Sequence, residues 1–340
     1  MHDSEMLSQV LDAADRRRVE RRQFLRSASV LGMAAGGSAL LAACGAGDKN
    51  KAPTPTPSSS GSPTPTPTGT ATISYAPADV FAFALNLEYL EAQFFSMAAT
   101  GKALDSTLTA GATTDAKVGT LTGGKQVTFT DPVVADFAHE IAADEKGHVT
   151  FLRTTLGSAV IAMPDINIDG SATGAFTAAA RAAGLVGSSA TFDPYASDTN
   201  FLLAAFLLED VIVTAYKGII PYVGTTTLLE ATGGLQATEA FHAAMIRSLL
   251  YAKGQTTASL ITSADALSNW RDSVDGTTDD DQGISTDVNG ASNIVPADSN
   301  SIVFQRTPPQ VLNIMFMNAA SGTAKGGFFP NGVNGTITES

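Results

Sequence analysis

Apolar residues recur at intervals of three and four in four stretches of the chain. One such stripe runs through Phe81, Leu85 and Phe95, and comparable stripes mark the other stretches. This spacing places the apolar side chains on one face of a helix. Asp131 and Pro132 are suited to begin the second stretch as N-cap and first-turn proline. The pattern predicts an all-α protein with helices over residues 77–100, 132–157, 199–219 and 225–253.

The connections between these helices differ in length. Residues 101–131 are rich in glycine and threonine, and the segment KQVTFT (125–130) is a candidate short strand. Residues 158–198 separate the second and third helices, which predicts a four-helix bundle with one long crossover at this point. Residues 255–310 are polar and are predicted to be irregular. An apolar segment, VLNIMFM (311–317), lies in a C-terminal extension.

Each predicted helix carries a glutamate on its apolar stripe, and two of these glutamates are followed three residues later by a histidine. An unpaired carboxylate is costly to bury, so the pattern needs a chemical reason. The residues are Glu88, Glu145, His148, Glu209, Glu239 and His242.

The two Glu-x-x-His motifs, EKGH and EAFH, predict a metal site. A glutamate and a histidine at i and i+3 share one helix face and can reach the same ion. Two helices that give one glutamate each, with two that give Glu-x-x-His, form the ligand set of a carboxylate-bridged dinuclear centre. Four carboxylates balance two divalent cations. Oxygen ligands with one imidazole per metal favour iron or manganese over zinc.

Several neighbours leave alternatives open. Glu91 could replace Glu88 as the ligand on the first helix. Asp210 could accept a hydrogen bond from a ligand histidine, although a surface position is the simpler interpretation. Tyr216 and Phe95 are expected in the core. In the competing interpretation the glutamates and histidines lie at the edges of the apolar stripes and form solvated ion pairs, for example with Lys146 or Arg247.

The N-terminal region predicts export. Arg21 and Arg22 open the sequence RRQFLR, and a weakly apolar stretch follows that ends in LAAC at Cys44. Paired arginines before such a stretch are typical of a twin-arginine signal. LAAC is similar to a lipobox, and Cys44 is the only cysteine in the chain. We expect a signal with lipobox over 1–44, a Pro/Thr/Ser-rich disordered linker over 45–71, and the folded domain over 72–340.

The formal net charge of −13 argues against nucleic acid as a partner. The expected partners are metal ions and, through a lipid on Cys44, a membrane. A homo-oligomer is compatible with the sequence. The expected location is extracytoplasmic, in the periplasm or at the cell surface.

Five segments resemble bacterial ferritin-like domain proteins related to plant desiccation-related proteins. They are LNLEYLEAQFF (85–95), FAHEIAADEKGHVTFLR (137–153), LLEDVIVTAYKGIIP (207–221), ATEAFHAAMIRSL (237–249) and the tail RTPPQVLNIMF…GGFFPNGVNG (306–335). The resemblance covers most of residues 77–335. It implies a ferritin-like four-helix bundle that holds two iron ions, with manganese as an alternative.

The function we expect for such a site is iron oxidation, or reduction of peroxide or oxygen, in stress or desiccation protection. The competing function is a non-catalytic envelope protein in which the metal site is structural or vestigial. Ferritin-like di-iron proteins commonly carry a tyrosine seven residues after the first glutamate ligand. Phe95 occupies that position here, so fast ferroxidase chemistry is not expected. A lipid anchor and large insertions also make a closed storage cage an unexpected assembly.

Overall fold

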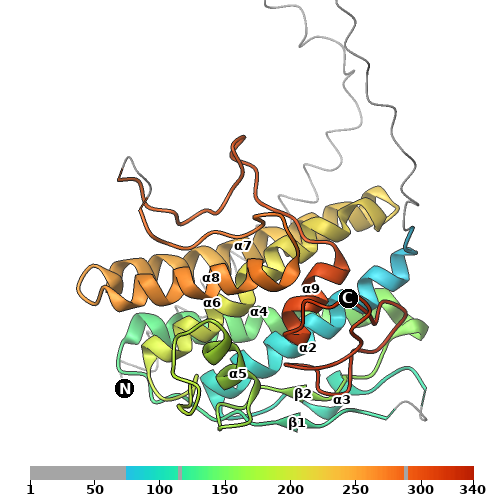
Figure 1. The fold of residues 1–340 in the computed structure, drawn as a ribbon. Coiled ribbons are helices and arrows are strands. Elements are labelled where there is room, and N and C mark those ends of the chain that lie inside the picture. The colour runs from blue at the N-terminus through green and yellow to red at the C-terminus, as the bar shows by residue number, and fades with distance from the viewer. Residues whose placement is uncertain (1–73, 114–116, 287–289) are drawn as a thin grey trace, which may run out of the picture. The chain divides into compact units, whose positions relative to one another are not determined.

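The computed structural model describes residues 74–113, 117–286 and 290–340. The predicted signal, Cys44 and the linker lie outside the described residues. Four long helices dominate the described part (Figure 1) and confirm the predicted all-α bundle. They are α2 (Pro77–Thr100), α4 (Pro132–Leu156), α6 (Asp198–Ile219) and α7 (Thr226–Gly254).

The bundle consists of two helical pairs. Helix α2 packs mainly against α4, and α6 packs mainly against α7. The second pair is joined by the short turn η2 (Ile220–Tyr222). The pairs themselves are joined by the long crossover between α4 and α6, as predicted. The crossover contains η1 (Gly157–Ala159), β2 (Ile166–Asn167) and α5 (Ala175–Ala182).

Local chemistry sets the start of α4. The Asp131 carboxylate accepts a hydrogen bond from the backbone N–H of Val133 at 2.9 Å, and Pro132 occupies the first turn. Both features satisfy or remove backbone donors that a helix start leaves unpaired. The predicted beginning of this helix is therefore confirmed.

The predicted irregular region 255–310 is partly wrong, because α8 (Ser259–Asp275) lies within it. The buried face of α8 includes Leu260, Ala264 and Leu267, which repeat with a helical period, followed by Arg271 and Asp275. The two charged residues belong to the buried face but read as surface residues in the sequence. Because polar side chains occupy some of the buried positions, the apolar residues alone did not show the helical period.

The strand predicted at KQVTFT is also wrong. The N–H of Val127 donates to the carbonyl of Ala98 at the end of α2 (2.9 Å) and so has no strand partner. A two-stranded parallel sheet forms nearby instead, from β1 (Leu121–Thr122) and β2, with Leu121 opposite Ile166. A short helix, α3 (Ser106–Thr109), precedes it.

The C-terminal extension covers the bundle. Helix α9 (Pro308–Phe316) contacts α6 and α8 and buries most of the apolar segment recognised in the sequence. Beyond it, Asn334 makes two hydrogen bonds with the buried side chain of Asn86 on α2, at 2.8 and 3.0 Å. The tail thereby fixes α2 two residues before Glu88. None of the described helices combines the length and apolar content that crossing a bilayer requires.

Candidate metal centre

The bundle brings together all six residues that the sequence singled out. Each of the four long helices contributes to the cluster, and the most exposed member, His148, is only 7 % exposed. The interpretation as solvated ion pairs is therefore wrong. The cluster consists of Glu88 from α2, Glu145 and His148 from α4, Glu209 from α6, and Glu239 and His242 from α7.

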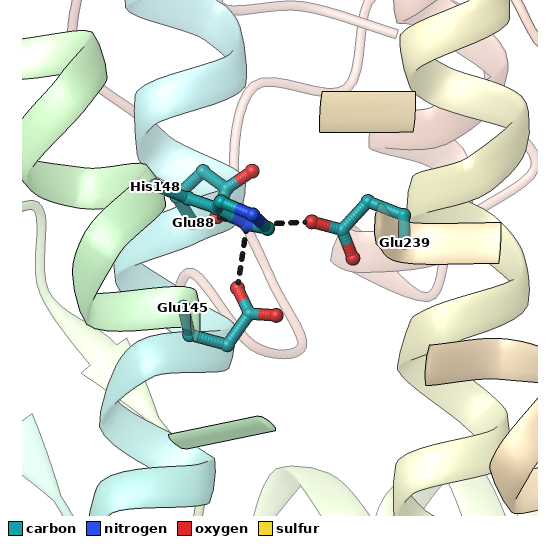
Figure 2. Close-up of side chains that lie close together, drawn as sticks. All are labelled: Glu88, Glu145, His148 and Glu239. Carbon is teal, nitrogen blue, oxygen red and sulfur yellow. Dashed lines mark ion pairs between the residues drawn. The ribbon is translucent and has the colours of Figure 1, made fainter. Parts of the chain in front are cut away.

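The six side chains form two overlapping sets, each with ligand atoms within 4.8 Å of one another. The first set is Glu88, Glu145, His148 and Glu239, shown in Figure 2. The second set is Glu145, Glu209, Glu239 and His242. Glu145 and Glu239 belong to both sets. The arrangement is consistent with a di-metal site in which these two glutamates bridge the ions.

In both sets an imidazole nitrogen faces the carboxylates. His148 Nδ1 lies 2.8 Å from Glu239 Oε1 and 3.3 Å from Glu88 Oε2. His242 Nδ1 lies 3.1 Å from Glu145 Oε1 and 3.8 Å from Glu209 Oε2. The two rings are 6.1 Å apart and nearly parallel, with 29° between their planes.

These close contacts are not aligned as hydrogen bonds. Both carboxylate oxygens of Glu145, Glu209 and Glu239 have no hydrogen-bond partner, and neither does Nδ1 of His148 or His242. Buried polar atoms are normally paired, and each exception requires an explanation. Lone pairs that converge without pairing are what a cation-binding set presents, and the donor types suit divalent iron or manganese. The residues present therefore fit a pair of such ions.

Electrostatics in the ion-free cluster lead to the same conclusion. Burial raises the pKa of Glu88 and of Glu209 well above the usual carboxylate range. Burial alone would lower the pKa of His242, but Glu209 and the other carboxylates raise it to about 12. The pKa of His148 is raised in the same way. Protons thus supply the positive charge that cations would supply, so cation binding must displace them.

A seventh residue, Asp144, was missed from the sequence. Its Oδ2 lies 3.3 Å from His242 Nε2, the ring nitrogen that faces away from the cluster. A carboxylate at this position fixes the ring orientation and tautomer of a metal-binding histidine. Asp210, considered for this role, instead pairs with Arg247 and Arg271 at 2.7 and 2.9 Å. The one sequence feature that could have pointed to Asp144 is its position directly before Glu145.

Tyr216 also belongs to the site, whereas it was expected only in the core. It follows Glu209 by seven residues, and its hydroxyl donates to Glu88 Oε1 across the bundle. Burial and the charge of Glu88 raise the pKa of Tyr216, so the phenol remains a proton donor. Phe95 is buried in the core as expected. Helix α2 has no tyrosine seven residues after Glu88, and a phenol reaches this glutamate from α6 instead.

Glu88 and Glu91, the two candidates on the first helix, differ in their position in the ion-free structure. Glu88 contributes a ligand atom to the first set, whereas Glu91 belongs to neither set. Glu91 is nevertheless completely buried, and both of its carboxylate oxygens have no hydrogen-bond partner.

Comparison with known proteins agrees with this geometry. The family model for the ferritin-like domain matches residues 76–252. "Ferritin-like catalase Nec2" of Nesocodon mauritianus is 29 % identical over 277 residues, which cover 76 % of this chain and 84 % of that protein. "Desiccation-related protein PCC13-62" of Craterostigma plantagineum is 33 % identical over 244 residues, covering 68 % and 74 % respectively. No solved structure matches the chain significantly. The extent of these matches shows that the chain belongs to the ferritin-like domain family.

Proposed function

We propose that this protein is a di-metal oxidoreductase that breaks down hydrogen peroxide, with iron or manganese as the metal. The observation that carries the proposal is the pair of buried Glu/His sets that share Glu145 and Glu239. A relative that matches over most of both chains is named a ferritin-like catalase, which supports peroxide as the substrate. A second relative is named for desiccation, a condition that fits a role in stress protection.

Each side chain of the cluster has a distinct task. Glu88 and His148 would hold one ion, Glu209 and His242 would hold the other, and the two shared glutamates would bridge them. A bound pair of redox-active ions would supply the electron exchange by which two molecules of hydrogen peroxide become two of water and one of oxygen. The protein supplies a buried, pre-arranged set of charges for this exchange.

Two further residues control protons and orientation. The Tyr216 hydroxyl donates a hydrogen bond to Glu88, which holds that carboxylate in place and keeps a proton beside the site. Asp144 faces the outer nitrogen of His242 and favours the tautomer in which Nδ1 is free to bind an ion. The side chain of His148 is 9 % exposed and marks where the cluster comes nearest to solvent.

Metal loading followed by peroxide turnover tests the proposal. The metal-free protein is loaded anaerobically with Fe(II) or Mn(II), the bound ions are counted, and oxygen release from hydrogen peroxide is followed. We expect two ions per chain and sustained oxygen release. Glu145→Gln should lose both the bound ions and the oxygen release, because Glu145 belongs to both sets. Glu140→Gln, an exposed change on the same helix, is the control.

Two outcomes would contradict the proposal. Two bound ions that release no oxygen from peroxide would leave a site that only holds the helices together. No bound ions, together with unchanged melting in Glu145→Gln, would remove the metal site altogether.

The role of Tyr216 can be separated from ion binding. Tyr216→Phe should retain two ions but lower turnover about tenfold, because it removes a hydrogen bond to a charged group. Tyr89→Phe is the matched control, since Tyr89 is also a buried tyrosine but pairs with Arg153 away from the cluster. Equal turnover in the two variants would show that the Tyr216 phenol only fills space.

We further propose that the protein is exported and lipid-anchored at Cys44 after twin-arginine signalling through Arg21 and Arg22. The sequence motifs support this location. Cys44→Ser should move the protein from the membrane fraction to the soluble extracytoplasmic fraction. Arg21→Lys together with Arg22→Lys should retain it in the cytoplasm. Unchanged fractionation in both variants would contradict the proposal.

A further inference from the structure

Glu91 is a buried carboxylate for which the six-residue cluster gives no role. It lies one helical turn after Glu88 on α2, is 0 % exposed, and has no hydrogen-bond partner at either oxygen. An unpaired buried carboxylate costs several kcal/mol unless it is neutral or meets a cation. Burial raises the pKa of Glu91 most, and the charges of the four cluster glutamates raise it further. These glutamates are therefore close enough to Glu91 to interact with it electrostatically.

Two contacts show which part of the site Glu91 faces. Tyr216 on α6 reaches Glu88 on α2, whereas the ring of Phe201 on α6 lies 5.9 Å from that of Phe95 on α2. The two helices therefore pass each other in opposite directions. Glu91 lies between these contacts along α2, and Glu209 lies between them along α6. The charges of Glu145, Glu209 and Glu239, the three glutamates of the second set, act on Glu91 more strongly than that of Glu88.

The two helical pairs differ at this position. Glu88 and Glu209 play equivalent parts, one in each set. Three residues after Glu209 the chain has Ile212, whereas three residues after Glu88 it has Glu91. Helix α2 therefore carries one buried carboxylate more than α6 at equivalent positions. Glu88 is in addition held by Tyr216.

Charge balance gives this asymmetry a chemical meaning. The four glutamates of the cluster balance two divalent ions, and a fifth carboxylate balances one further positive charge. We propose that Glu91 is a fifth carboxylate ligand, which binds the ion held by Glu209 and His242 and makes this position the tighter of the two. The inference rests on the proposed di-metal site and adds that its two positions are unequal.

Stepwise binding of Mn(II) under anaerobic conditions tests the inference without turnover. Wild-type protein should bind two ions in two resolved steps. Glu91→Gln should still bind two ions, but the tighter step should weaken by about tenfold or more, the range seen when a supporting carboxylate is lost from a metal site. Glu140→Gln, exposed on α4, should leave both steps unchanged.

Double variants identify the ion that Glu91 serves. Adding Glu91→Gln to Glu209→Gln should hardly change binding of the ion held by Glu88 and His148, because both substitutions affect the other ion. Adding it to Glu88→Gln should weaken both steps. Cobalt(II) absorption gives a second readout, since loss of a ligand at one position should change the intensity of the visible bands in Glu91→Gln. Glu91→Asp, which keeps the charge, should fold and shift these bands less.

The inference fails if Glu91→Gln binds both Mn(II) ions as tightly as Glu140→Gln and leaves the cobalt spectrum unchanged. It also fails if Glu91→Gln weakens the step assigned to Glu88. Failure in these ways would leave the di-metal proposal intact, because the wild-type protein would still bind two ions. Only a wild-type protein that binds no ions would overturn both.

Discussion

Glu209 and Asp210 are neighbours on α6, yet they belong to two different buried charge clusters, one without and one with pairing cations from the protein. Glu209 faces the metal centre, where its two oxygens have no hydrogen-bond partner. Asp210 faces the other side of the helix and accepts from Arg247 and Arg271. Successive residues of a helix are about 100° apart around its axis, so adjacent side chains can serve separate surfaces.

The second group, here called the Arg–Asp cluster, is balanced by the protein itself. Arg271 Nε lies 2.5 Å from Asp281 Oδ2, and Arg306 Nε lies 2.6 Å from Asp275 Oδ2. The arginines are fully buried. The cluster consists of Arg247, Arg271 and Arg306 with Asp210, Asp275 and Asp281.

The contrast separates a structural cluster from a binding site. Three guanidinium groups meet three buried carboxylates in the Arg–Asp cluster, with the partly exposed Asp272 3.8 Å from Arg306, so the cluster needs no added cation. The metal centre has five buried glutamates, including Glu91, and only two histidines. The Arg–Asp cluster also ties α6 and α7 to α8 and the C-terminal extension. It thereby holds two of the ligand-bearing helices in position.

The largest expected effect comes from breaking the balanced cluster. Asp210→Asn removes the carboxylate shared by Arg247 and Arg271 and should lower the free energy of unfolding by about 3–5 kcal/mol. Chemical denaturation of the metal-free protein measures this loss. Asp136→Asn, on an exposed face of α4, should have almost no effect. Equal stability of the two variants would show that the Arg–Asp cluster does not hold the fold.

The same chemical change one residue earlier should act in the opposite way. Glu209→Gln removes an unpaired buried acid, so the metal-free protein should remain as stable as the wild type or become more stable, within about 1 kcal/mol. Its affinity for one of two Mn(II) ions should fall by about 100-fold or more, because loss of a ligand should exceed the 10- to 100-fold cost of losing a residue that only supports a ligand. Destabilisation comparable to that of Asp210→Asn would remove the distinction between the clusters.

A smaller effect is expected at the edge of the metal centre. Asp144→Asn weakens the interaction with His242 Nε2, so ion affinity should fall about tenfold while the fold is retained. The measurement is competitive Mn(II) binding against a chelator, with Asp136→Asn as control. An affinity equal to that of the control would show that the exposed carboxylate does not orient the ring.

The stability of the metal-free protein should also depend on pH. Raised pKa values of Glu88, Glu209 and both ligand histidines mean that the folded protein binds more protons than the unfolded chain. Its free energy of unfolding should therefore decrease as pH rises from about 5 to about 9. Ion affinity should increase over the same range, because protons compete with cations. Thermal melts with and without Mn(II) at each pH measure both trends, and a metal-free protein that gains stability with pH would contradict the assignment.

Residue spacing was sufficient to predict the long helices and the six-residue cluster. An i, i+3 pair on a helix has one geometry, so EKGH and EAFH placed a glutamate and a histidine on a common face before any packing was known. The helix α8 was not predicted, because residues 255–310 are polar and were expected to be irregular. Arg271 and Asp275 read as solvated residues because their partners, Asp281 and Arg306, are distant in the sequence.

The sequence by itself determined which helices form and which of their faces carry the acids and histidines, because these properties depend on residues within a few positions of one another. Only the tertiary structure decided which charges are neutralised. It paired Asp210 with arginines from α7 and α8, directed Tyr216 to Glu88 and placed Asp144 beside His242. It also left Glu91 buried with no hydrogen-bond partner at either oxygen. These outcomes depend on how helices far apart in the chain pack and which groups burial removes from water, and local periodicity does not encode either.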